Sequence, residues 1–165
     1  MATLTDNVNV NEAAIAAISD RYDEPAWLRA EREAALRSYA AMPFPTEKTE
    51  EWRYTQLKRF DIAGLELAKA PKDESISERI RMRIADSDAE GVMVHKGNQV
   101  VLKQAQIKEQ GVVFTDLRTA VREHEELVRE HLYSVVNATQ TKYTALNSAL
   151  WENGTFVYVP KDVEV

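Results

Sequence analysis

The spacing of apolar residues predicts that the chain begins with helices and continues as a mixture of short strands and helices. Residues 10–22 place Ala14, Ile15, Ile18 and Tyr22 at intervals of three and four, which is the spacing of one face of an α-helix. The polar residues that precede this pattern are expected to be loose.

A second, longer helix is expected to start at Pro25 and to end before Pro43 and Pro45. Proline suits the first helical position, where its missing N–H is not needed. The two later prolines deny the helix donors and crowd its last turn. Glutamate and arginine occupy the polar face. The apolar face comprises Leu28, Ala35, Tyr39 and Met42.

Residues 44–60, FPTEKTEEWRYTQLKRF, gather large rings and charges into one stretch. Thr49 can cap a further helix there, with Glu50 and Glu51 in the first turn, where acidic side chains are favourable. We expect this helix to run for about two turns before a polar connector begins.

Trp52, Arg53 and Tyr54 form the most conspicuous cluster of that stretch. Tryptophan, tyrosine and arginine are the residue types most enriched at protein-binding hot spots. The same types are also ordinary residues of cores and junctions, where a guanidinium can stack on a ring. Two interpretations therefore stay open: the cluster packs a domain junction, or it forms a surface that binds a protein or peptide.

The second half of the chain changes its hydrophobic period. Two β-branched runs, Val92–His95 and Gln99–Lys103, flank Lys96-Gly97-Asn98, and this arrangement predicts a β-hairpin. Residues 111–115 predict a third strand. Residues 116–135 then step at helical intervals and predict a helix.

A last short helix is predicted over residues 141–151, with Tyr143, Leu146 and Leu150 on its apolar face and a left-handed cap at Asn153-Gly154. The sequence therefore predicts an α+β fold.

The final residues, TFVYVPKDVEV, predict a strand, a turn led by proline and the start of another strand. A strand needs a neighbour for its backbone donors and acceptors. Because no further residues follow in the sequence, we expect a sheet to be interrupted here.

Composition limits the classes of function. The net charge of −6 argues against a nucleic-acid-binding surface, which needs clustered lysine and arginine. No apolar run approaches the roughly 20 residues of a membrane span, and no secretory signal is present, so the sequence predicts a cytoplasmic protein without a membrane partner. The chain has no cysteine, which excludes disulfides, thiolate nucleophiles and cysteine-ligated clusters within it.

His124 and His131, in HEELVREH, are the first candidates for metal or catalytic chemistry. A zinc protease helix places its two histidines four residues apart. These two are seven apart, which separates them by about 10 Å along a helix and is too far for one ion. Because His95 also has no partner in the sequence, we predict no catalytic, metal-ligating or cofactor-binding residue. A hydrolase that uses either helical histidine with a nearby glutamate is the third interpretation.

Residues 24–62 resemble the amino-terminal region of SufD-like scaffolds, members of the SufB/SufD family of iron–sulfur cluster assembly proteins. The most specific run is Glu50–Thr55, EEWRYT; EPAWL and MPFP support it. Residues 145–165 are similar to the stretch that leads into the β-helical core of this family. Asp162 departs from the family pattern, which usually has glycine after VPK.

The resemblance implies a non-enzymatic scaffold that pairs with SufB and with the ATPase SufC in the cytosol, where the complex builds and transfers clusters. It implies a helical segment at 1–65, a small α+β section at 66–152 and the start of a truncated β-helix at 153–165. The chain would then be the N-terminal accessory domain, either as a fragment or as a shortened product, and no flavin fingerprint occurs in it. The alternative is a free-standing helical adaptor that binds a protein or peptide through Trp52-Arg53-Tyr54.

Overall fold

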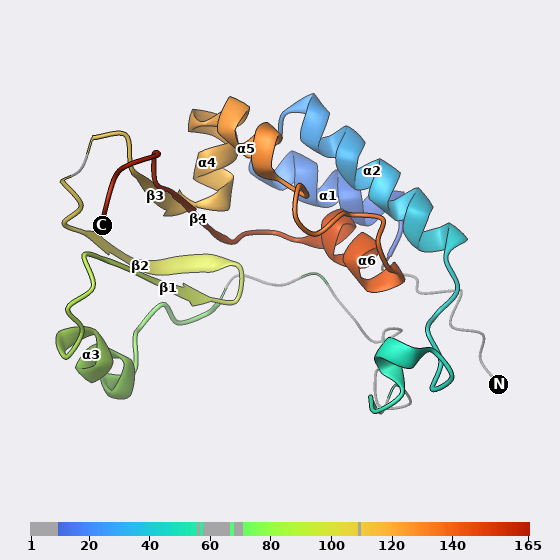
Figure 1. Cartoon of the computed structure of the whole chain (residues 1–165), viewed down its shortest axis with the longest axis horizontal. Coiled ribbons are helices and arrows are strands. Elements are labelled where there is room, and N and C mark those ends of the chain that lie inside the picture. The colour runs from blue at the N-terminus through green and yellow to red at the C-terminus, as the bar shows by residue number, and fades with distance from the viewer. Residues whose placement is uncertain (1–9, 56, 58–66, 68–70, 109) are drawn as a thin grey trace. The chain divides into compact units, whose positions relative to one another are not determined.

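The computed structural model describes residues 10–55, 57, 67, 71–108 and 110–165, and the chain divides into two compact units (Figure 1). Unit 1 comprises residues 1–67 and 126–151, and unit 2 comprises residues 68–125 and 152–165. The units are thus interleaved along the chain. The three consecutive ranges expected from the sequence stay a prediction. No helix in the described part of the chain is long and apolar enough to cross a bilayer.

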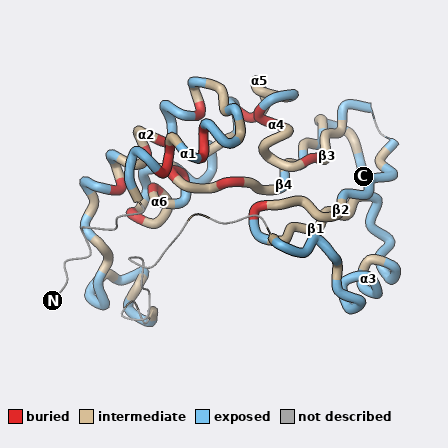
Figure 2. Tube along the Cα trace, turned by 180° about the vertical axis from the view of Figure 1, so that it is seen from behind, coloured by how far each residue is buried: buried red, intermediate tan, exposed pale blue. Residues whose placement is uncertain are grey.

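Unit 1 is helical, and its helices α1, α2 and α6 pack on one another. Its elements are α1 (Glu12–Tyr22), α2 (Ala26–Ala41), the 3₁₀ turn η1 (Glu50–Trp52), α5 (Glu125–His131, whose first residue belongs to unit 2) and α6 (Lys142–Leu150). Figure 2 marks buried positions along α1, α2 and α6. The described apolar core of this unit comprises Ala14, Ile15, Ile18, Leu28, Ala35, Tyr39, Val128, Ala145 and Ala149.

Local chemistry explains where the first two helices begin and end. The Asn11 side chain accepts a hydrogen bond from the Ala14 amide at 2.9 Å and caps α1. Asp23 leaves the helix at a φ of 48°, in the left-handed region. Pro25 is the residue before α2 rather than its first residue, and α2 ends at Ala41, before the two prolines, as expected.

The described residues of unit 2 form two antiparallel strand pairs and two helices. Its elements are α3 (Glu78–Ala85), β1 (Gly91–Lys96), β2 (Gln99–Ala105), β3 (Val113–Asp116), α4 (Leu117–Glu123) and β4 (Thr155–Tyr158). The predicted hairpin is confirmed: β1 pairs with β2, and Gly97 turns between them at a φ of 61°, which glycine adopts without steric cost. The predicted third strand is confirmed as β3, and the described elements together form the predicted α+β fold.

A polar network fastens the hairpin turn to the residues before β4. The Asn98 amide nitrogen donates to the Glu152 carboxylate at 2.9 Å, and both residues are buried. The carbonyl of Asn98 accepts hydrogen bonds from the side chains of Arg118 and Asn153. Unit 2 is therefore held together by polar side chains as well as by apolar packing.

The single helix predicted over 116–135 is wrong. The backbone leaves the helical region at His124, so that α4 ends there and α5 starts at Glu125. The two halves have different packing partners, because α4 contacts β3 and β4, whereas the Arg129 guanidinium of α5 lies over the Trp27 ring at 5.4 Å. A regular periodicity in the sequence does not reveal this change of partner.

The predicted apolar face and cap of the last helix are also wrong. The buried residues of α6 are Lys142, Ala145, Ser148 and Ala149, and the three larger residues expected there are only half-buried. Small residues on this face allow α6 to approach α2 closely. The helix ends at Trp151 in an extended conformation, so no left-handed cap forms at Gly154.

The end of the chain pairs differently from the expectation. β4 has a neighbour, because it pairs antiparallel with β3, Phe156 opposite Thr115. No second strand follows it within 159–165. The interrupted sheet expected there is therefore not observed at β4. The truncated β-helix expected from the resemblance stays a prediction.

Two further expectations for the connecting segments failed. In place of the first turn of the α-helix expected after Thr49, residues 50–52 form the 3₁₀ turn η1. The Thr49 hydroxyl accepts a hydrogen bond from the Thr46 amide at 3.1 Å and does not cap this turn. Most of the predicted second turn lies outside the described residues. Helix α3 was missed, because its short amphipathic pattern is flanked by polar residues.

Candidate functional site

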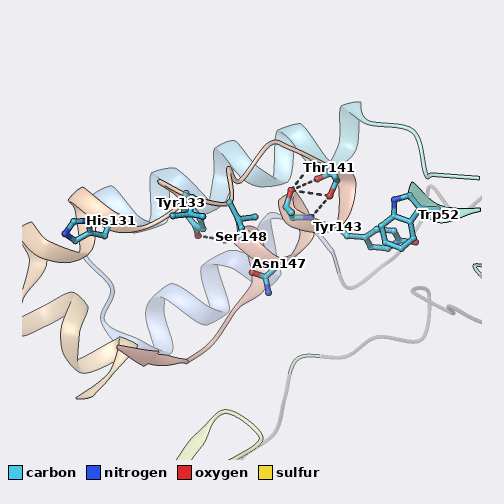
Figure 3. A pocket seen from close by; sticks show the side chains of 10 residues that line it. Trp52, His131, Tyr133, Thr141, Tyr143, Asn147 and Ser148 are labelled. Atoms are coloured by element: carbon cyan, nitrogen blue, oxygen red, sulfur yellow. Dashed lines mark hydrogen bonds between the residues drawn. The ribbon is translucent and has the colours of Figure 1, made fainter. Parts of the chain in front are cut away.

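The 3₁₀ turn η1 carries Trp52 onto the first turn of α6. The ring centroids of Trp52 and Tyr143 are 4.8 Å apart, with the planes tilted by 40°. Phe44 meets Tyr143 at 6.3 Å, and Tyr39 meets Phe44 edge-on at 6.2 Å. Pairs of this kind contribute about 0.5–1.5 kcal/mol each beyond the burial of area. Half-buried Trp52 therefore packs the segment after α2 onto α6, in a junction (Figure 3).

Arg53 and Tyr54 behave differently from Trp52. The Tyr54 side chain is 88% exposed. The Arg53 guanidinium lies over the Tyr54 ring at 4.8 Å, donates to its hydroxyl at 3.0 Å and pairs with Glu50 at 3.2 Å. The cluster expected from the sequence is thus divided between a packed ring and an arginine–tyrosine pair that faces solvent.

An apolar hollow lies beside the ring pair of Trp52 and Tyr143 (Figure 3). Its volume is about 520 Å³. Val135 is 93% exposed and Val136 is 55% exposed at this hollow. The other residues that line it are His131, Tyr133, Thr141, Thr144, Asn147 and Ser148. A surface of this kind can receive apolar side chains of another protein.

A second hollow, of about 480 Å³, shares Trp52 and Tyr143 with the first. Its remaining wall includes Pro43, Phe44 and Pro45 from the segment after α2. The ring pair therefore lines two surface hollows of unit 1. A change at Trp52 would alter the packing of the junction and the shape of both hollows together.

The ammonium of Lys142 closes the C-terminal end of α2. Its Nζ donates to the carbonyls of Tyr39 at 2.6 Å and Met42 at 2.7 Å. The same Nζ lies over the rings of Tyr39, at 4.1 Å, and Phe44, at 4.4 Å. A cation at the negative end of a helix, with aromatic faces around it, is a stabilising arrangement.

Arg32 plays the matching role at the C-terminal end of α6. Its side chain is fully buried and makes two hydrogen bonds with the carboxylate of Glu24, at 2.8 and 2.6 Å. The same guanidinium donates a third hydrogen bond to the carbonyl of Ala149 at 3.1 Å, and it lies over the Trp151 ring at 4.4 Å. Ser19 also donates to Glu24 at 3.1 Å.

The two buried cations clamp α2 and α6 in an antiparallel pair. Lys142, at the start of α6, binds the end of α2, and Arg32, within α2, binds the end of α6. Each cation satisfies carbonyl groups that a helix end leaves without a partner. The charged residues at the centre of unit 1 therefore hold helices together.

Burial is the first cause of every shifted pKa in this part of unit 1. It raises the pKa of Tyr39, to which nearby Tyr143 adds, and it raises the pKa of Tyr143 itself. It also raises the pKa of Tyr133, against the opposing hydrogen bonds with Trp151 and Ser148. Burial lowers the pKa of Lys142. These phenols are thus shifted further from ionisation at neutral pH.

The three histidines lie in separate surroundings. His124 ends α4, and His131 is the last residue of α5 and lines the first hollow. His95 lies within hydrogen-bond distance of the Thr155 hydroxyl, 3.0 Å away. Among the described residues, no three histidine, aspartate or glutamate side chains gather in a group that could hold a metal ion.

Arg32 and Lys142 are the important residues that the sequence reasoning missed. The signal was present, because Arg32 lies four residues after Leu28 and three before Ala35, on the apolar stripe of α2. Lys142 likewise lies three residues before Ala145 on the buried face of α6. A long charged residue at an apolar position predicts a buried, hydrogen-bonded cation.

Comparison with known proteins identifies the family. The model of the SufBD protein N-terminal region matches residues 9–165. A Staphylococcus epidermidis protein named as an iron–sulfur cluster assembly SufBD family protein is 32% identical over 98% of this chain, and Bacillus subtilis iron–sulfur cluster assembly protein SufD is 29% identical over 99%. A Mycobacterium tuberculosis SufBD family protein is 32% identical over 94% of the chain.

The chain spans only part of these relatives. It covers 36% of the Staphylococcus protein, 38% of the Bacillus protein and 20% of the mycobacterial one. The resemblance to SufD-like N-terminal regions is confirmed. This chain belongs to the SufBD family of iron–sulfur cluster assembly proteins and corresponds to its N-terminal region.

Proposed function

We propose that this chain is the non-catalytic N-terminal region of a SufD-like scaffold in iron–sulfur cluster assembly. The observation that carries the proposal is the family match over residues 9–165, together with the similarity to B. subtilis SufD. The partners of the whole protein would be a SufB-like scaffold and a SufC-like ATPase, in the cytoplasm. Iron–sulfur clusters are cargo of that complex, and the proposal assigns no cofactor to this chain.

The chemistry of unit 1 supports a structural role. Its buried charged groups, Arg32, Glu24 and Lys142, all bind helix ends or one another. Catalytic residues are instead expected to have side chains that can reach a substrate. Trp52 supports the same reading, because it packs the junction between the end of α2 and the start of α6.

The adaptor alternative has one observation in its favour. Tyr54, Val135 and Val136 are exposed, and both valines border the apolar hollow beside Trp52. Exposed apolar groups around a hollow are typical of protein interaction sites. On this reading, unit 1 would bind a protein or peptide without the rest of a scaffold.

The test replaces the N-terminal region of B. subtilis SufD with this chain, in cells depleted of their own SufD. We expect the chimera to restore the activity of an iron–sulfur enzyme such as aconitase, whereas a version without the region does not. A chimera with Arg37→Glu is the matched control, because Arg37 is exposed and has no interaction in the described part of the chain. A chimera that accumulates normally and restores nothing would overturn the proposal.

Two variants of the chimera separate the alternatives. His124→Ala with His131→Ala should retain full activity, and its loss in a folded protein would favour a catalytic role. Tyr54→Ala, at a ring that faces solvent, should also leave the activity unchanged. A strong loss with Tyr54→Ala would favour the adaptor reading.

A further inference from the structure

Two side chains of strand β1 meet the same hydroxyl group of strand β4, within unit 2. Met93 and His95 are separated by one residue, so both project from one face of β1. The Nε2 atom of His95 lies 3.0 Å from the Thr155 hydroxyl oxygen, and this hydroxyl donates to the Met93 sulfur at 3.8 Å. A thioether and an imidazole, which are both ligand types for metal ions, thus converge on one point.

The pairing of the hairpin changes at this point. Val94 is opposite Leu102, but the next residue, His95, is opposite Val100. The shift leaves Val101 without a partner in the pairing, as in a β-bulge. Bulges re-aim neighbouring side chains and are over-represented next to functional sites. The irregularity of the hairpin therefore lies beside the histidine of the converging pair.

The converging groups are accessible to a small ion. Met93 and His95 are half-buried, and Thr155 is exposed. The Nδ1 atom of His95 has no hydrogen-bond partner in the part of the chain that the structure describes. Neither the sulfur nor the imidazole is thus committed to a strong contact, because a thioether is only a weak acceptor.

A purely structural reading accounts for only part of this arrangement. The Lys103 ammonium donates to the Thr115 hydroxyl at 3.1 Å and so already links β2 with β3. The contact between His95 and Thr155 is a second link of the same kind. The Met93 sulfur adds little strength to that link. A ligand role for the sulfur explains why it lies beside the imidazole.

The nearby charge favours a monovalent ion over a divalent one. Lys103 is the cross-strand partner of Met93, so the two side chains leave the hairpin on the same face. A lysine ammonium repels a dication more strongly than a monocation at the same distance. Among the described residues, no group of three histidine, aspartate or glutamate side chains is present to offset a double charge.

We propose that Met93 and His95 bind a soft monovalent metal ion, Cu(I). Thioether sulfur selects Cu(I), and imidazole nitrogen also suits copper. Structural Zn²⁺ sites are instead tetrahedral and use cysteine, histidine and carboxylate ligands. Ca²⁺ and Mg²⁺ require sets of oxygen ligands. Cu(I) also accepts a nearly linear arrangement of two ligands, which these side chains can supply. The inference goes beyond the proposed function and does not depend on it.

Binding requires changes at side chains only. The single hydroxyl proton of Thr155 is donated to Met93, so the Nε2 atom of His95 carries the ring proton in the hydrogen bond to Thr155. When the ion binds, this proton moves to Nδ1 through solvent, and the Nε2 lone pair faces the ion. The flexible side chain of Met93 turns its sulfur from the hydroxyl to the same ion. Copper enters and stays as Cu(I), so no electron is transferred.

The experiment observes the methionine methyl groups directly by NMR. The full chain is labelled with ¹³C at these methyl groups and titrated anaerobically with Cu(I), which acetonitrile keeps in solution. Met82 is the internal control, because it is 60% exposed and therefore more accessible than half-buried Met93. We expect a saturable shift of the Met93 methyl signal and of the His95 ring signals, at concentrations that leave the Met82 signal unchanged.

Matched variants test both ligands. Met93→Leu preserves the apolar volume, and His95→Gln preserves a side chain that can hydrogen-bond to Thr155. Each should weaken Cu(I) binding by about tenfold or more, since even groups outside the ligand set of a metal contribute this much. Met82→Leu and His131→Gln make the same substitutions elsewhere and should leave the affinity within about twofold. Circular dichroism verifies that the variants are folded.

Several results would overturn the inference. If the Met82 signal moves together with that of Met93, the thioethers bind Cu(I) as isolated groups. If His95→Gln binds like the unchanged chain, the imidazole is not a ligand. Zn²⁺ that shifts the His95 signals at lower concentration than Cu(I) would refute the choice of ion, and no saturable shift of Met93 would refute the site. None of these results affects the proposed function, which the SufD chimera tests separately.

Discussion

Removing one charge of the buried Arg32–Glu24 pair is the most direct test of how unit 1 is held together. Glu24→Gln keeps the size of the side chain and one carbonyl acceptor, but it removes the negative charge. Arg32 is then left fully buried opposite a neutral amide, with its remaining contacts to Ala149 and Trp151 intact.

The expected loss is large because the charge of Arg32 cannot reach water. Breaking a buried ion pair by removing one partner typically costs about 3–5 kcal/mol. The side chains of Arg32 and Glu24 are 0% and 4% exposed, so solvent screening does not reduce this figure. With a urea dependence of about 2 kcal/mol per molar, the midpoint of unfolding should fall by about 1.5–2.5 M.

Tryptophan fluorescence during urea unfolding measures this change in unit 1 alone, since Trp27, Trp52 and Trp151 all lie there. Glu33→Gln is the matched control. This variant makes the same substitution in an exposed ion pair, in which the Glu33 carboxylate lies 3.4 Å from the Arg29 guanidinium. Exposed pairs contribute about 0–1 kcal/mol, so its midpoint should hardly move.

A double variant separates the charge from the packing. Arg32→Met added to Glu24→Gln removes the uncompensated cation, and part of the lost stability should return, because replacing a buried pair by apolar groups is often neutral. The carbonyl of Ala149 then lacks its donor, which limits the recovery by about 1–3 kcal/mol. Equal midpoints for Glu24→Gln and Glu33→Gln would refute the reasoning.

Two further predictions concern the aromatic junction and the start of α4. Trp52→Ala should lower the free energy of unfolding by about 2 kcal/mol, roughly half the cost at a fully buried ring, whereas Tyr54→Ala should leave it unchanged. Thermal denaturation measures both variants. Equal effects would contradict the finding that Trp52 packs the junction while Tyr54 faces solvent. Burial raises the pKa of Asp116, but hydrogen bonds from the side chain and amide of Thr119 outweigh this and hold it below its ordinary value. The stability that ionised Asp116 contributes to the folded protein is therefore fully present above about pH 3.9, the pKa of an unperturbed aspartate. It is lost as the pH falls through the lower pKa that Asp116 has in the folded state. Asp116→Ala should therefore cost about 1 kcal/mol at neutral pH and flatten the acid limb followed by circular dichroism; an unchanged limb would contradict the cap.

The sequence was a good guide to elements whose signals are local. The hairpin around Gly97 and the helix that ends before Pro43 depend on turn chemistry and on missing donors, and both are confirmed. The break at His124 was not predictable in this way, because neither glycine nor proline marks it. It follows from two halves of a periodic segment packing on different partners.

The candidate site shows the same limit. Trp52, Arg53 and Tyr54 were singled out by residue type, but type alone does not say which ring packs and which faces solvent. That division depends on Tyr143, which is distant in sequence. Arg32 and Lys142 carried a readable signal as charges on apolar stripes, yet their partners are carbonyl groups at the ends of other helices. The periodicity of apolar residues in a sequence does not show which backbone carbonyl a buried cation will bind.

Contacts of Arg32 join the two separated stretches that carry the family resemblance. Glu24 and Arg32 belong to the first stretch, and Ala149 and Trp151 belong to the second, yet the guanidinium of Arg32 contacts all three of the others. Glu152, the next residue, already belongs to unit 2, where it binds Asn98. The two stretches thus form one framework in unit 1, and the second continues directly into unit 2. The framework needs residues from both stretches, because a buried cation requires its carboxylate and its carbonyl acceptor at the same time.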